Sequence, residues 1–144
     1  MQARRNSRLA AVQAIFQYYF LKQDIESVME EFCKYRLIEK KNYDIVFFRQ
    51  LVSGVDEKQE TIKKYITNSL SEKWMIERLD YTIQSIISLG IYELISCNSI
   101  PLKVVINEYV SISSLYFDDS NIGFVNGVLD NLGKIIRNEV LINE

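Results

Sequence analysis

The chain has 144 residues, of which 48% are hydrophobic and 25% charged, and its formal net charge at pH 7 is -2. This apolar fraction is too high for a disordered chain, and the length suits one domain with its own core. The sequence contains no histidine, which excludes imidazole acid–base catalysis, Ser-His-Asp and Cys-His dyads and every metal site with a histidine ligand. Cys33 and Cys97 lie far apart without a CxxC motif, so we expect two reduced, buried thiols.

A helical spacing of apolar residues, three or four positions apart, runs through nearly the whole chain. It predicts a first helix behind a Ser7 cap, a second helix from Asp24 and one long third helix over 45–66. A fourth helix is predicted over 83–95, a fifth after Pro101, and a sixth that Asp119 or Ser120 would cap. The apolar stripes of the first and last helices are Leu9, Val12, Phe16, Tyr19 and Phe20, and Phe124, Val128, Leu129, Leu132 and Ile136.

β-structure is the alternative fold class, because Val, Ile, Phe and Tyr are plentiful. A β-sandwich needs many tight turns, which five glycines and one proline do not supply. The best hairpin signal is Asn126-Gly127, but its flanks repeat with helical spacing, so Gly127 inside a helix indicates a closely packed neighbour. We therefore predict an all-α fold, with residues 1–144 forming one compact helical domain. Two three-helix sub-bundles, about 1–70 and 71–144, would meet near 68–73.

The apolar stretch 9–21 is too short to span a bilayer and contains two glutamines. Basic residues precede it, but no small-residue cleavage site follows, which argues against a signal peptide. An organelle transit peptide stays open as an alternative, because the N-terminus is rich in arginine and free of acids. We expect a soluble cytoplasmic protein without a membrane segment.

The basic residues gather at the N-terminus. Residues 1–23 contain Arg4, Arg5, Arg8 and Lys22 and no acid, whereas residues 24–144 hold 13 basic and 19 acidic residues. An acidic body with a basic tip suggests an anionic partner, and nucleic acid is the usual one. A solvated, frayed N-terminus is the alternative interpretation.

Motifs for catalysis are missing from the sequence. It has no Walker loop, no GxGxxG and no calcium-binding loop. The adjacent carboxylates Asp118 and Asp119 suit the start of a helix better than acid–base or metal chemistry. We therefore expect a binding protein and no enzyme, with no cofactor and no metal site.

Several strings of the sequence are recognisable as family motifs. The N-terminal blocks are 3–8, 11–16 and 43–55, followed by 91–94. The two most specific blocks are Pro101-Leu102-Lys103-Val104-Val105-Ile106-Asn107-Glu108 and Phe124-Val125-Asn126-Gly127-Val128-Leu129-Asp130. Together these blocks resemble the NusB family of transcription antitermination factors, since they follow the order of the family and extend over nearly the whole chain.

The resemblance implies an all-helical RNA-binding protein of transcription regulation that has no catalytic activity. Such a protein binds boxA, a short single-stranded element in the leader of ribosomal RNA transcripts. It does so together with a small-subunit ribosomal protein (NusE), within a complex that lets RNA polymerase pass terminators. Arg4, Arg5 and Arg8 match the basic motif of the family, and Phe124 matches an aromatic position near the RNA. Phe16 matches an aromatic position that faces the ribosomal protein.

The residues themselves leave other interpretations open. Phe16 and Phe124 both lie on apolar stripes and could belong to the core. A helical protein–protein interaction module that binds no RNA is the alternative function, and its partner could be a second copy of the chain.

Overall fold

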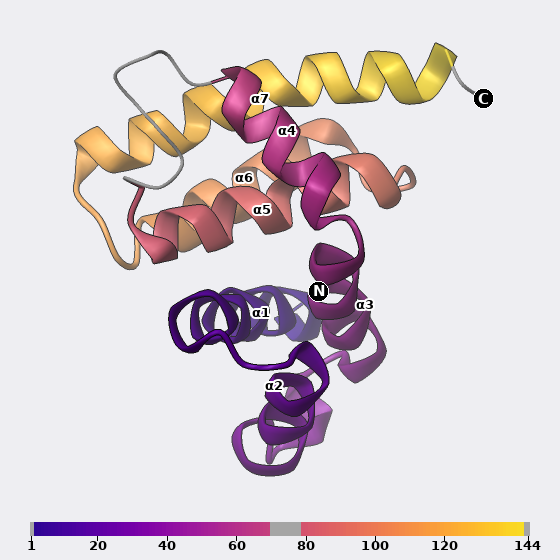
Figure 1. The fold of residues 1–144 in the computed structure, drawn as a ribbon, viewed down its shortest axis with the longest axis vertical. Coiled ribbons are helices and arrows are strands. Elements are labelled where there is room, and N and C mark those ends of the chain that lie inside the picture. The colour runs from indigo at the N-terminus through magenta and orange to yellow at the C-terminus, as the bar shows by residue number, and fades with distance from the viewer. Residues whose placement is uncertain (1, 70–78, 143–144) are drawn as a thin grey trace.

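The structure is a computed structural model that describes residues 2–69 and 79–142 (Figure 1). These residues form helices, turns and loops without a strand, which confirms the all-α prediction. No helix within them combines the length and the apolar character that crossing a membrane requires. The helices are α1 (Gln2–Leu21), α2 (Ile25–Glu31), η1 (Phe32–Arg36, a π-helical turn), η2 (Lys40–Asn42, a 3-10 turn), α3 (Ile45–Glu57), α4 (Gln59–Ser69), α5 (Tyr81–Ser96), α6 (Leu102–Ser113) and α7 (Asp119–Ile142).

Two long helices, α1 and α5, lie at the centre of the molecule and pack against each other. α2 and α3 cover α1, and α6 and α7 cover α5 (Figure 1). The predicted junction at 68–73 falls mostly outside the described residues, and its described part belongs to α4. α4 packs on α5 and α7 although it precedes residue 70. The division into sub-bundles at about residue 70 therefore stays a prediction.

The prediction of one helix over 45–66 is wrong, because the chain bends at Lys58. This residue has a φ of -102° and a ψ of 20°, outside the helical region, and it separates α3 from α4. α3 packs on α1, α2 and α5, whereas α4 packs on α5 and α7. The bend at Lys58 thus redirects the chain from α1 and α2 towards α7. The apolar stripe carries a polar residue, Gln59, at this place, so the sequence does contain a sign of the break.

Ser7 is not the cap of α1, as the sequence predicted, because the helix already begins at Gln2. The Ser7 hydroxyl donates to the carbonyl of Ala3 at 2.8 Å and accepts the backbone N–H of Asp44 at 2.8 Å. Asp44 in turn caps α3 by accepting the N–H of Phe47 at 3.0 Å. The serine thus fixes the first turns of α1 against the start of α3.

The face of α1 that enters the core also differs from the prediction. Of the predicted stripe only Val12 is fully buried, whereas Phe16 is 36% and Phe20 58% exposed. Three alanines and one isoleucine are buried instead, because α1 lies between α3 and α5 and packs closely on both. These core residues are Ala10, Ala11, Ala14 and Ile15.

Close packing at Gly127 was predicted, and the structure contradicts it. A Cβ at Gly127 or at Gly123 would meet no atom within 4 Å. The tight contacts lie at three other glycines. A Cβ would stand 2.1 Å from the ring of Tyr92 at Gly54, 2.4 Å from Leu102 at Gly133 and 2.9 Å from Leu129 at Gly90. Gly123 and Gly127 of α7 therefore face open space, whereas Gly133 of the same helix is closely packed.

The structure also tests the caps that the sequence predicts for α2 and α7. Asp24 accepts the N–H of Ser27 at 3.3 Å, which confirms that a helix starts behind it. α7 begins at Asp119, and Asp118 accepts the N–H of Asn121 at 3.3 Å, so the cap is Asp118 and not Asp119 or Ser120. An acid at a helix start also interacts favourably with the helix dipole.

Cys33 and Cys97 are free and buried, as predicted. Burial raises the pKa of both thiols. Both side chains therefore stay in the neutral S–H form at physiological pH.

Candidate functional site

The N-terminal end of α1 presents two exposed arginines. The side chain of Arg4 is 51% exposed, and that of Arg5 is 63% exposed. Nε of Arg4 lies 3.7 Å from the carboxylate of Asp44, and Nε of Arg5 donates to Glu108 at 3.1 Å. Arg4 therefore faces α3 and Arg5 faces α6. Asp44 is 36% exposed and Glu108 is 16% exposed. Ion pairs that water reaches contribute little stability, so a phosphate can compete with these carboxylates for the two guanidinium groups.

Arg8 does not join this exposed end of the helix. Its side chain is 4% exposed and is paired with Glu93 on α5, which is fully buried. Nε and Nη2 of Arg8 donate to the two carboxylate oxygens of Glu93 at 2.8 and 2.9 Å. The hydroxyl of Tyr109, on α6, donates to the same carboxylate at 2.5 Å. The three side chains form a buried polar network that ties α1 to α5 and α6.

The protonation of this network follows from its burial. Burial lowers the pKa of Arg8, but its hydrogen bond to Glu93 and the charge of Glu93 raise it more, and the net shift is upward. Burial raises the pKa of Tyr109 well above its usual value, and the charge of Glu93 adds to the shift. Arg8 is therefore held as a cation and Tyr109 as a neutral donor.

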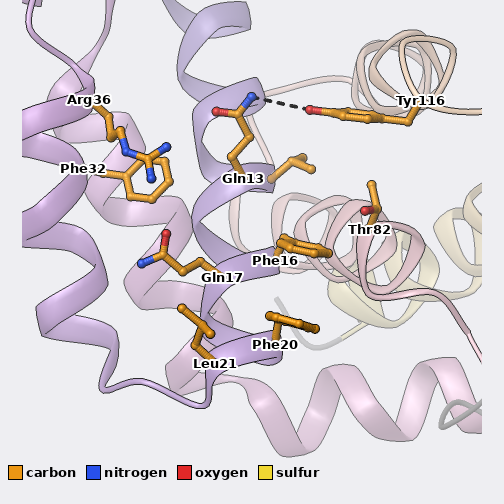
Figure 2. A pocket seen from close by; sticks show the side chains of 10 residues that line it. Gln13, Phe16, Gln17, Phe20, Leu21, Phe32, Arg36, Thr82 and Tyr116 are labelled. Carbon is orange, nitrogen blue, oxygen red and sulfur yellow. Dashed lines mark hydrogen bonds between the residues drawn. The ribbon is translucent and has the colours of Figure 1, made fainter.

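Phe16 lies in a groove of about 590 Å³ beside α1 (Figure 2). The rings of Phe16 and Phe20 stack with their centroids 5.7 Å apart, and Tyr81 meets Phe20 edge-on at 6.2 Å. Gln13 donates to the hydroxyl of Tyr116 at 3.5 Å. The side chains that line the groove come from α1, η1, α5 and the turn after α6, and they are Val12, Gln13, Phe16, Gln17, Phe20, Leu21, Phe32, Arg36, Thr82 and Tyr116.

The composition of the groove suits a protein partner. Neighbouring exposed aromatic rings beside a few amide and hydroxyl groups are typical of the centre of a protein–protein interface.

The part of the chain that the structure describes holds no cluster of acids and cysteines that could bind a metal ion.

Phe124 is half-buried on α7 and lines a separate hollow of about 270 Å³ with Leu79, Ile83, Ser120 and Asn121. This hollow lies at the start of α5, which meets the C-terminal end of α1 through Tyr81 and Phe20. Fifteen residues of helix, about 22 Å, separate Phe20 from Arg5. The structure therefore does not bring Phe124 together with Arg4 and Arg5.

Sequence analysis missed a second basic segment. Residues 34–42 contain four basic residues and a single acid, Glu39. The acidic balance of residues 24–144 as a whole conceals this local excess of basic residues, which a count over shorter windows reveals. The basic residues are Lys34, Arg36, Lys40 and Lys41.

Glu93 was missed as well. It is a lone acid between the apolar residues Ile91 and Leu94. A charge inside an apolar stretch indicates a buried partner of opposite sign.

Known proteins resemble this chain over nearly its full length. The model of the NusB family matches residues 5–134. A transcription antitermination protein NusB from Sphingopyxis alaskensis is 38% identical over 94% of this chain and 95% of its own. The NusB of Caulobacter vibrioides is 36% identical over 95% of this chain and 96% of its own.

Solved structures agree with the sequence comparisons. The T. maritima NusB structure has a TM-score of 0.81 at 32% identity and covers 93% of both chains. A structure of the antitermination factors NusB and NusE in complex with double-stranded RNA has a TM-score of 0.79 at 26% identity, and it covers 94% of this chain and 98% of that one. The chain thus belongs to the NusB family of transcription antitermination proteins.

Proposed function

We propose that this protein acts in transcription antitermination in the cytoplasm by binding RNA and a small ribosomal protein, without catalysis. The RNA is a boxA-like single strand in the leader of ribosomal RNA transcripts, and the protein is the counterpart of NusE. The similar NusB that was solved with NusE and double-stranded RNA supports this assignment.

The observation that carries the proposal is the exposure of Arg4 and Arg5 at the start of α1. Guanidinium groups pair with phosphates and stack on bases, and the free N–H groups of the first helical turn add positive potential. Each arginine of the two ion pairs is itself more than half exposed, although Glu108 is only 16% exposed. The RNA backbone therefore displaces Asp44 or Glu108 from a guanidinium that water already reaches.

Arg8 has a supporting role in this mechanism. Its guanidinium is occupied by Glu93 and lies out of reach of solvent. It fixes the position of α1, and with it the position of the two exposed arginines.

Phe124 and Phe16 serve different parts of the complex. An RNA that contacts both Arg5 and Phe124 runs along the length of α1, and the ring of Phe124 then stacks on a base, which contributes about 1–3 kcal/mol. The groove around Phe16 takes the protein partner. A helical interaction module without RNA binding is the second candidate function, because the same groove fits a second copy of the chain or another protein.

Replacing Arg4 and Arg5 with Ala is expected to weaken RNA binding by about 25-fold at 0.1 M salt. Two fewer phosphate contacts lower the slope of log affinity against log salt by about 1.4 for a single strand. The measurement is fluorescence anisotropy with a labelled boxA-like RNA over a salt series, with and without the ribosomal protein.

The matched control replaces Lys63 and Lys64, two exposed lysines of α4, with Ala. It removes the same charge as the arginine variant, but far from the start of α1. An interaction module without RNA binding would instead form its protein complex equally well with or without RNA. Equal RNA affinities for the wild type, the arginine variant and the control would reject the proposal.

A further inference from the structure

η2, which carries Lys40 and Lys41, lies against the first turns of α1. Nδ2 of Asn6 donates to the carbonyl of Asn42 at 2.9 Å. The Ser7 hydroxyl accepts the N–H of Asp44 at 2.8 Å. Since both hydrogen bonds start one or two residues from Arg5, they hold the lysine-bearing turn beside the exposed arginines.

The lysines of η2 are the less neutralised cations at this end of the molecule. Lys40 and Lys41 are exposed, and within the described residues neither lies within ion-pair distance of a carboxylate. Arg4 and Arg5, in contrast, are each paired with a carboxylate. The single acid of the segment, Glu39, accepts a hydrogen bond from the side chain of Asn42 at 3.3 Å.

The basic segment continues beyond η2 towards α2. Nζ of Lys34 lies 5.3 Å from the centre of the Tyr35 ring, which is itself exposed. The guanidinium of Arg36 lies 5.0 Å from the centre of the Phe32 ring. Cations interleaved with an exposed aromatic ring offer both phosphate pairing and base stacking.

We propose that Lys40 and Lys41 extend the RNA-binding surface, so that the RNA backbone passes from Arg4 and Arg5 across η2. This inference rests on the proposed function. A strand of regularly spaced phosphates fits a row of separated cations that continues from the arginines. The lysines supply counterion release without breaking an ion pair, whereas the arginines first exchange a carboxylate for a phosphate.

The test compares Lys40→Ala/Lys41→Ala with the matched control Lys63→Ala/Lys64→Ala. Fluorescence anisotropy measures the affinity for a labelled single-stranded boxA-like RNA over a salt series. A separate titration with the labelled ribosomal protein measures the affinity for that partner. The η2 variant is expected to lose about 25-fold in RNA affinity at 0.1 M salt, and its salt slope is expected to fall by about 1.4. The control is expected to bind like the wild type, and equal helical circular dichroism for all three proteins would show that folding is unchanged.

The outcomes separate this inference from the proposed function. If the wild type binds RNA and the η2 variant binds as well as the control does, the inference is wrong and the proposed function stands. If the η2 variant loses affinity only for the ribosomal protein, the lysines serve an acidic protein segment, which also overturns the inference. If the wild type binds no RNA with or without the ribosomal protein, the proposed function fails and the inference fails with it.

Discussion

Replacing Glu93 with Gln is expected to lower the free energy of unfolding by about 3–5 kcal/mol, because it leaves the guanidinium of Arg8 buried without a counter-charge. Glu93 is fully buried and accepts hydrogen bonds from Arg8 at 2.8 and 2.9 Å. It also accepts the hydroxyl of Tyr109 at 2.5 Å. Since the network joins α1, α5 and α6, its loss would loosen the contact between the two central helices.

The control for this prediction is Glu108→Gln, which breaks the ion pair with Arg5. That arginine is 63% exposed, so water takes over its solvation and the expected loss is below about 1 kcal/mol. Urea unfolding followed by circular dichroism measures both variants. If both variants lost the same free energy of unfolding, burial of the Arg8–Glu93 pair would not determine how much this pair contributes to stability.

The double variant Arg8→Met/Glu93→Met separates structure from RNA contact. Two apolar side chains of similar volume remove both charges together, so we expect a smaller loss of stability than in Glu93→Gln. If Arg8 only positions α1, this variant keeps its RNA affinity once it is folded. A folded variant that has lost its RNA affinity would instead assign Arg8 a direct contact with RNA.

Replacing Phe16 and Phe20 with Ala is expected to weaken binding of the ribosomal protein by about 2–4 kcal/mol, or about 30-fold to 1,000-fold in affinity. The two rings stack on each other and are 36% and 58% exposed. Isothermal titration calorimetry with the partner protein measures the loss. Because both side chains are partly in solvent, stability is expected to change less than affinity.

Leu141→Ala is the control for the groove variant, because Leu141 is an exposed apolar residue of α7 outside the groove. It is expected to bind the partner like the wild type. Unchanged binding by the Phe16/Phe20 variant would place the protein partner on another surface.

The helical nature of the chain could be predicted from local spacing, but the buried face of α1 could not. A stripe of large apolar residues favoured Phe16 and Phe20 as core. The buried face of α1 instead consists of three alanines with Val12 and Ile15, which lie between α3 and α5. Which face is buried depends on the neighbouring helices, and these are distant in sequence. The rings of Phe16 and Phe20 stay outside the core and line the groove beside α1.

The burial of Arg8 at the candidate site could not be predicted from the sequence for the same reason. Three arginines at the start of the chain look equivalent in the sequence, yet Arg8 is paired with an acid 85 positions away. The prediction of close packing at Gly127 is wrong for a related reason, because helical spacing does not show which face of α7 meets solvent. The residues of the family blocks could be identified from the sequence alone. Which of them are exposed follows only from the three-dimensional structure.

Photo-crosslinking tests the central claim most directly, because it reports where RNA lies on the folded protein. A boxA-like RNA that carries 4-thiouridine is irradiated with the wild-type protein and its ribosomal partner, and the crosslinked peptides are identified by mass spectrometry. We expect crosslinks in the peptides that contain residues 2–8 and 40–42 and in the peptide that contains Phe124. Crosslinks confined to other surfaces, such as α4, or the absence of any crosslink to this chain, would contradict the account.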